Sequence, residues 1–120
     1  MIRHLYLIEL TVADWEHSVT WYRDTLGLTL EMKVDADRYA LFQAGFGRVA
    51  LKAGKPQNSS ILLSFEVDDL VLDIQRLRSL GVVPRDPIKT SPEGYRRAII
   101  SDPDGYAISL FEWNLSLPQE

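Results

Sequence analysis

The sequence predicts an α+β fold built from two tandem βαβββ modules. The same strand-to-helix signature occurs twice, at Val12-Ala13-Asp14 and at Val67-Asp68-Asp69, with an offset of about 55 residues. Each copy begins with an alternating apolar stretch, continues as an amphipathic helix and ends in short β-type runs around a glycine turn. A repeat of this length indicates a duplicated supersecondary unit.

The first module is expected over residues 5–54. Its first strand runs from Leu5 to Val12, and a helix follows with Asp14 at its N-cap and Gly27 at its left-handed C-cap. A last strand near residues 48–53 follows the turn Gly45-Phe46-Gly47. Because successive side chains of a strand alternate between its faces, one row of the first strand is expected to pack against helices, namely Tyr6, Ile8, Leu10 and Val12.

The second module is expected over residues 61–114, after a polar linker at 55–60 and before a short tail at 115–120. Its strand at residues 61–67 leads to a helix between Asp69 and Gly81, which should be equivalent to the helix of the first module. The proline-rich segment 84–94 is unsuited to a central strand and predicts an edge strand or a flap.

Composition narrows the class of protein. The chain has 120 residues, which is about one domain, and it lacks cysteine, which excludes disulfides, thiol nucleophiles and cysteinyl metal sites. The net charge of −4 comes without a basic cluster and argues against nucleic acid as a partner. No apolar run of membrane-spanning length and no secretory leader is evident, so the expectation is a cytoplasmic protein with no membrane partner.

The sheet faces turned away from the helices predict a ligand pocket. Strand alternation puts a mixed polar and apolar row there, and a merely solvated face would rarely keep Leu7, Leu62 and Phe111. An ordinary exposed face or a dimer seam is the alternative. The predicted ligand-binding residues are Leu7, Glu9, Thr11, Arg48, Ala50, Lys52, Leu62, Ser64, Glu66, Arg97, Ser109 and Phe111.

Several motifs together resemble the vicinal oxygen chelate superfamily, which includes glyoxalase I, extradiol dioxygenases and bleomycin-resistance proteins. They are Val12-Ala13-Asp14, Trp21-Tyr22, Leu26-Gly27-Leu28, Phe65-Glu66-Val67-Asp68-Asp69-Leu70 and Asp102-Pro103-Asp104-Gly105-Tyr106. The resemblance covers residues 5–113. It implies that the two modules form an incomplete, U-shaped barrel around a cavity, commonly in a homodimer.

Enzymes of that superfamily hold a divalent metal at set positions, and the resemblance places these positions at Leu7, Ala50, Leu62 and Ser109. None of these side chains is a usual metal ligand. Glu112 looks like a family ligand, but it has the opposite strand parity from Ser109 and should point away from the pocket. The expectation is therefore a protein without a metal or another cofactor.

Two carboxylates and several rings are the remaining candidates. Glu9 and Glu66 are expected to face the pocket. Four alternative roles are open to them: ion pairing with Arg48 and Lys52, recognition of a cationic ligand, acid-base catalysis, or metal binding. Five aromatic residues near the open edge offer flat contacts, namely Tyr39, Phe42, Tyr95, Phe111 and Trp113. The histidines, His4 and His17, are expected to be surface or partly buried residues without a site role.

The function predicted from these residues is metal-free binding of a small organic molecule in the cavity, as in bleomycin-resistance proteins. One alternative is an enzyme of the superfamily, either metal-dependent through other ligands or cofactor-free through Glu9 or Glu66. The other alternative is a structural dimer with a vestigial pocket.

Overall fold

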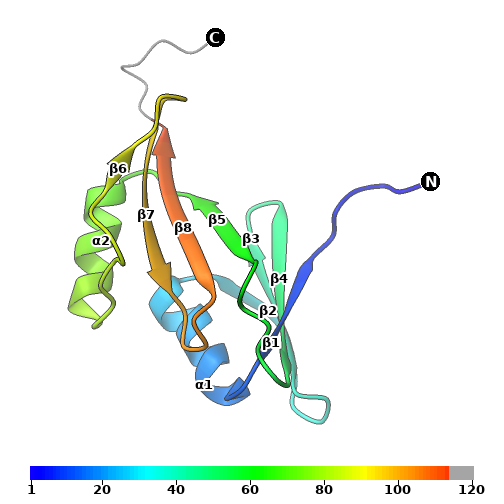
Figure 1. Cartoon of the computed structure of the whole chain (residues 1–120). Coiled ribbons are helices and arrows are strands. Elements are labelled where there is room, and N and C mark those ends of the chain that lie inside the picture. The colour runs from blue at the N-terminus through cyan, green and yellow to red at the C-terminus, as the bar shows by residue number, and fades with distance from the viewer. Residues whose placement is uncertain (114–120) are drawn as a thin grey trace. The chain divides into compact units, whose positions relative to one another are not determined.

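A computed structural model describes residues 1–113, which form two compact units: Met1–Gln57 and a second that begins at Asn58. The boundary lies within the predicted linker at 55–60. Each unit contains one four-stranded mixed sheet and its helix, so the predicted α+β fold of two βαβββ modules is confirmed (Figure 1). Residue 114 of the second module and the tail 115–120 lie outside the described residues.

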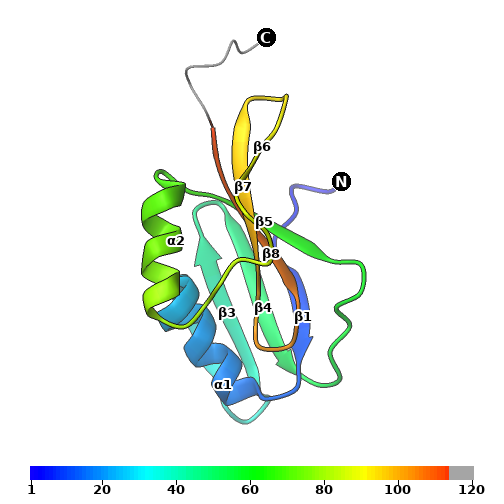
Figure 2. The ribbon, with the colours of Figure 1, turned by 60° about the vertical axis from the view of Figure 1, so that its left-hand side comes forward.

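The sheet of the first unit has the strand order β1-β4-β3-β2. β1 is parallel to β4, and the other pairs are antiparallel. The elements are β1 (Ile8–Val12), α1 (Trp15–Thr20), η1 (Trp21–Leu26), β2 (Thr29–Val34), β3 (Tyr39–Ala44) and β4 (Gly47–Ala53). In Figure 2, α1 lies across one face of this sheet. Leu10, Val12 and Leu51 of the sheet and Val19 of the helix are almost fully buried there.

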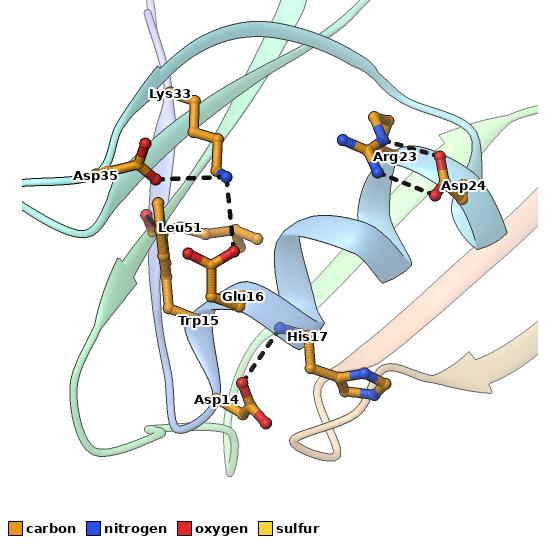
Figure 3. Close-up of polar contacts among 9 residues, drawn as sticks. All are labelled: Asp14, Trp15, Glu16, His17, Arg23, Asp24, Lys33, Asp35 and Leu51. Atoms are coloured by element: carbon orange, nitrogen blue, oxygen red, sulfur yellow. Dashed lines mark hydrogen bonds and ion pairs between the residues drawn. The ribbon is translucent and has the colours of Figure 1, made fainter.

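The start of α1 shows why the chain turns into a helix at this point. Asp14 is the N-cap, as predicted, and its carboxylate accepts a hydrogen bond from the backbone N–H of His17 at 3.2 Å (Figure 3). The Trp15 indole N–H donates to the Leu51 carbonyl at 3.2 Å and so ties the helix to β4. The Lys33 ammonium lies 5.3 Å from the centre of the Trp15 ring and completes this contact.

The two helices are not equivalent, contrary to the expectation from the repeat. The first continues from α1 into a π-helical segment, η1, whereas α2 (Leu70–Ser79) is a regular α-helix. The wider turn ends with the N–H groups of Gly27 and Leu28 both donating to the Tyr22 carbonyl, at 3.2 and 2.9 Å. Gly27 makes this possible because its φ of 91° lies in the left-handed region.

The first strand is shorter than predicted, because β1 begins at Ile8 rather than Leu5. In the parallel register Ile8 lies opposite Val49, and β4 begins only at Gly47, directly after a hairpin turn. The pairing with β4 begins at Ile8, and no described residue before it is paired. Tyr6 and Ile8 are 49% and 40% exposed, so the prediction that they pack against helices was wrong.

The sheet of the second unit has the strand order β5-β8-β7-β6. Its strands are β5 (Leu62–Glu66), β6 (Lys89–Thr90), β7 (Tyr95–Ser101) and β8 (Ala107–Trp113). The two-residue β6 is an edge strand in the proline-rich segment, in agreement with the prediction. α2 has Asp69 at its N-cap and buries Leu70, Ile74 and Leu77. No helix in residues 1–113 has the length and apolar character needed to cross a bilayer.

Glu112 of β8 caps α2 from the sheet. One carboxylate oxygen accepts from the Leu70 backbone N–H at 2.7 Å, and the other accepts from the Arg96 guanidinium at 2.8 Å. These two hydrogen bonds, the Leu70 contact first, lower the pKa of the Glu112 carboxyl below its ordinary value. Glu112 thus lies on the helix side of β8, as strand parity predicted, and joins helix to sheet.

We expect the Glu112→Gln variant to have a lower Tm than the wild type at pH 7. A lowered folded-state pKa stabilises the fold fully above the unfolded-state value, and this contribution is lost as the pH falls through the folded-state value. The difference in Tm should therefore shrink below about pH 4. Thermal unfolding across pH tests this, with Glu66→Gln as the control because Glu66 is exposed. A difference in Tm that is independent of pH would contradict the capping role.

Candidate functional site

A pocket opens on the face of the second sheet that is turned away from α2. It has a volume of about 240 Å³ and is lined by Ser64 of β5, Tyr95 and Arg97 of β7, and Ser109, Phe111 and Trp113 of β8. Alternation along the strands places these residues on one face, whereas Ile108 and Leu110 on the other face are buried. Three neighbouring strands therefore supply one continuous concave surface.

Three rings form an aromatic cluster (Tyr95, Phe111 and Trp113) at one side of the pocket. Tyr95 lies directly opposite Trp113 in the β7–β8 pairing. The ring centres are 5.6 to 5.8 Å apart, and all three pairs meet edge to face. Each ring positions the other two, so the cluster presents a preformed apolar wall to a flat ligand.

The polar side of the pocket carries a cation without a carboxylate partner among the described residues. Arg97 is half-buried and lies opposite Phe111, and no ion pair to it occurs in this part of the chain. Arg96, the preceding residue, faces the other side and is paired with Glu112. Adjacent arginines on one strand thus have different roles, one holding the fold together and one facing the pocket.

Ser109 at the floor of the pocket is 1% exposed, and its Oγ has no hydrogen-bond partner among residues 1–113. A buried hydroxyl without a partner costs on the order of 1–3 kcal/mol relative to a satisfied one. Ser64 lies directly opposite Ser109 in the parallel β5–β8 pairing and is exposed. The pocket therefore combines an apolar wall with an unused hydroxyl and a guanidinium.

The other predicted site residues of the second unit lie beside the pocket. Glu66 is exposed and lies opposite Phe111 in the β5–β8 pairing. Leu62, at the start of β5, is 48% exposed and is not among the lining residues.

In the first unit, several predicted ligand-binding residues make structural contacts instead. Thr11 Oγ1 donates to the Lys55 carbonyl at 2.6 Å, and the Lys52 ammonium donates to the Asp37 carbonyl at 2.5 Å. Ala50 is fully buried at the centre of the sheet and offers no open surface. Thr11 and Lys52 thus each bond to a carbonyl of a connecting segment, and Ala50 fills the interior of the sheet.

Within the first unit, whose residues the structure describes in full, Glu9 forms no ion pair with Arg48 or Lys52. Arg48 pairs with Glu31 at 3.3 Å and stacks over the Tyr6 ring at 4.5 Å. Glu31 lies at the β-bulge between Leu30 and Met32, where the extra residue re-aims a side chain. Glu9 is exposed, and its negative charge lies near Tyr39 instead. The pKa of Tyr39 is raised, first by burial of its hydroxyl and second by the charge of Glu9.

A second hollow, of about 410 Å³, lies in the first unit and was not predicted. Its lining residues are His4, Leu5, Gln43, Gly45, Phe46 and Arg48. They come from the segment before β1 and from the β3–β4 hairpin. Leu7, the last residue of the segment before β1, is half-buried, and Phe46 is fully exposed at the hairpin turn. The hollow contains no buried polar atom that lacks a partner.

Two lining residues of the second-unit pocket, Tyr95 and Trp113, were predicted only as aromatic candidates and not as ligand-binding residues. Strand parity contains the missing signal, because each lies two residues from a predicted site residue, Arg97 and Phe111 respectively. Of the three remaining aromatic candidates, Phe111 lines the pocket, whereas Phe42 and Tyr39 belong to the first unit, where Phe42 is fully buried in the core and Tyr39 is half-buried.

The four positions at which the family resemblance implies metal ligands do not fit a divalent ion. Leu7, Ala50 and Leu62 have no donor atom, and Ser109 alone supplies a neutral hydroxyl. Within residues 1–113, no group of three or more histidine, aspartate or glutamate side chains is arranged to hold a metal ion. His4 and His17 are exposed and belong to no such group.

Known proteins resemble this chain over most of its length. A model of the Glyoxalase/Bleomycin resistance protein/Dioxygenase superfamily matches residues 4–110. The uncharacterized protein YraH of Bacillus subtilis (strain 168) is 29% identical over 125 aligned positions, which cover 90% of this chain and 97% of YraH.

Solved structures with a similar fold include two proteins whose names state what they bind or catalyse. TnmS3, an antibiotic binding protein from Streptomyces sp. CB03234, is 29% identical with a TM-score of 0.80, covering 93% of this chain and 97% of its own. A lactoylglutathione lyase from Agrobacterium tumefaciens has a TM-score of 0.76 over 95% of this chain and 96% of its own. At 20% identity, the likeness to the lyase concerns the fold alone.

Proposed function

Because the chain belongs to the Glyoxalase/Bleomycin resistance protein/Dioxygenase superfamily, we propose that it binds and sequesters a small organic molecule without the help of a metal ion. The observation that carries the proposal is the hydroxyl of Ser109, which is buried at the floor of a ring-lined pocket and has no partner in the described part of the chain. A ligand atom that bonds to this hydroxyl recovers the free energy that the protein loses by burying it alone.

The pocket has the composition of a small-molecule site. Ligand sites are concave and mostly apolar, with a few placed polar groups, and the aromatic cluster with Ser64, Arg97 and Ser109 follows that pattern. Its volume of about 240 Å³ exceeds the roughly 150 Å³ of a cavity that holds benzene. The similarity to TnmS3, an antibiotic binding protein, supports binding rather than turnover.

We expect Trp113→Ala to weaken ligand binding about ten-fold or more, because it removes one ring of the pocket wall. A library of aromatic fragments is screened by chemical-shift changes in two-dimensional NMR spectra, and the dissociation constants of the hits are compared between variants. Phe46→Ala is the matched control, since this exposed ring belongs to the hollow of the first unit. Hits that weaken with Phe46→Ala alone would place the binding site in the first unit and refute the proposal.

Native mass spectrometry of the purified protein tests the remaining parts of the proposal. The expected species is a homodimer, as the family resemblance implies, without a divalent ion and with a retained organic adduct. One tightly held divalent ion per subunit would overturn metal-free sequestration, and a monomer at high protein concentration would overturn the dimer.

A further inference from the structure

Among the described residues that line the pocket of the second unit, Arg97 is the only charged one, and a second cation, Lys89, lies beside it. Arg97 lies directly opposite Lys89 in the β6–β7 pairing, and residues that are directly opposite point to the same face of a sheet. Like charges at such positions destabilise a sheet. Within the described part of the chain, neither cation forms an ion pair with a carboxylate.

The surrounding charges do not neutralise this pair. Glu66 belongs to the same cross-strand row, but Phe111 lies between it and Arg97. The other nearby carboxylate, Glu112, is on the opposite face and is already bound to Arg96 and the start of α2. An anion in the pocket would therefore relieve a repulsion that the protein by itself leaves in place.

The unused hydroxyl of Ser109 points to the same kind of ligand. It is buried on the pocket side of β8, one alternation from Phe111, which is the cross-strand partner of Arg97. A carboxylate has two oxygens and accepts several hydrogen bonds at once, whereas a cationic group would present only donors to Arg97. The edge-to-face rings beside it suit a flat aromatic body.

We infer that the ligand class of this pocket is an aromatic carboxylate, whose ring lies against the aromatic cluster and whose carboxylate is bound by Arg97, with Ser109 donating a hydrogen bond and Lys89 adding charge. This inference rests on the proposed binding function. It assigns Arg97 as the residue that selects the charge of the ligand.

Three isosteric probes test the charge preference: benzoate, neutral benzamide and cationic benzamidine. Their dissociation constants for the full chain are measured by NMR titration at low salt. We expect the dissociation constant of benzoate to be lower than that of benzamide by a factor of about ten or more, and that of benzamidine to be the highest. Arg97→Gln should abolish the preference for benzoate, and Lys89→Gln should reduce it.

Matched variants separate the pocket from general charge and packing effects. Arg96→Gln removes the adjacent arginine on the other face and should leave the preference for benzoate unchanged. Ser109→Ala should weaken the binding of benzoate. Ser18→Ala should not, although Ser18 also has a buried hydroxyl without a partner among the described residues. Thermal unfolding of each variant confirms that it is folded.

The outcomes distinguish this inference from the proposed function. Equal binding of the three probes at the pocket would overturn the carboxylate assignment and leave sequestration standing. Tighter binding of benzamidine than of benzoate would also overturn the carboxylate assignment but not the proposed function. The same holds if none of the three probes binds while neutral fragments of the library do. Failure of every compound of any charge to shift the pocket resonances would overturn the proposed function.

Discussion

Replacing Phe42 with alanine is expected to lower the free energy of unfolding by about 3–5 kcal/mol, the usual cost of truncating a buried phenylalanine. Phe42 is fully buried in β3, where it lies opposite Val49 of β4. Its ring centre is 6.0 Å from that of Tyr22 in η1, which is also fully buried. The substitution therefore leaves a cavity between the sheet and the π-helical turn.

Phe46→Ala is the matched control, four residues further along the same hairpin. Its side chain is fully exposed, so we expect a change within about 0.5 kcal/mol. Urea denaturation of both variants measures the two free energies. Similar losses for Phe42 and Phe46 would contradict the packing of the first unit described above.

The second large effect is expected for Asp102→Ala, which should cost about 2–4 kcal/mol. Asp102 is 5% exposed, and its Oδ1 accepts hydrogen bonds from the backbone N–H groups of Asp104 and Tyr106, at 2.9 and 2.8 Å. Alanine leaves both donors without this acceptor. It also loosens the turn that introduces the fully buried Tyr106 into the core.

Asp102→Asn tests whether the acceptor oxygen is what matters, because asparagine keeps a carbonyl oxygen at the same position. We expect it to lose less than half of the stability lost by the alanine variant, as measured by urea denaturation. Equal losses for the two variants would show that the charge of Asp102, and not its acceptor geometry, stabilises the turn.

Much of the fold could be predicted because its signals are local. Asp14 and Asp69 cap helices by bonding to N–H groups three residues further on, and Gly27 ends the first helix through its own backbone conformation. The repeat of these signals predicted two βαβββ modules. The π-helical turn was not predicted. It contains Tyr22, whose ring packs against Phe42, and such a contact between residues distant in sequence leaves no local signal.

The candidate site was predictable only in part. Strand alternation places Ser109, Phe111 and Arg97 toward one face and Arg96 and Glu112 toward the other, and this requires only the sequence of each strand. The position of Lys89 opposite Arg97 could not be predicted, because the register between β6 and β7 depends on the conformation of the proline-rich segment that joins them. The absence of a partner for the Ser109 hydroxyl likewise depends on every side chain around it.

The sequence by itself determined the two modules, the ends of their helices and the alternation of side chains between the two faces of each strand. These features depend on interactions over a few positions. Only the tertiary structure decided which charges meet and which polar groups stay unpaired. Glu31, the partner of Arg48, lies where the register between β2 and β3 shifts, and the bond of Thr11 to Lys55 joins residues 44 positions apart. Such contacts depend on the register between strands that are distant in sequence, which local patterns do not contain.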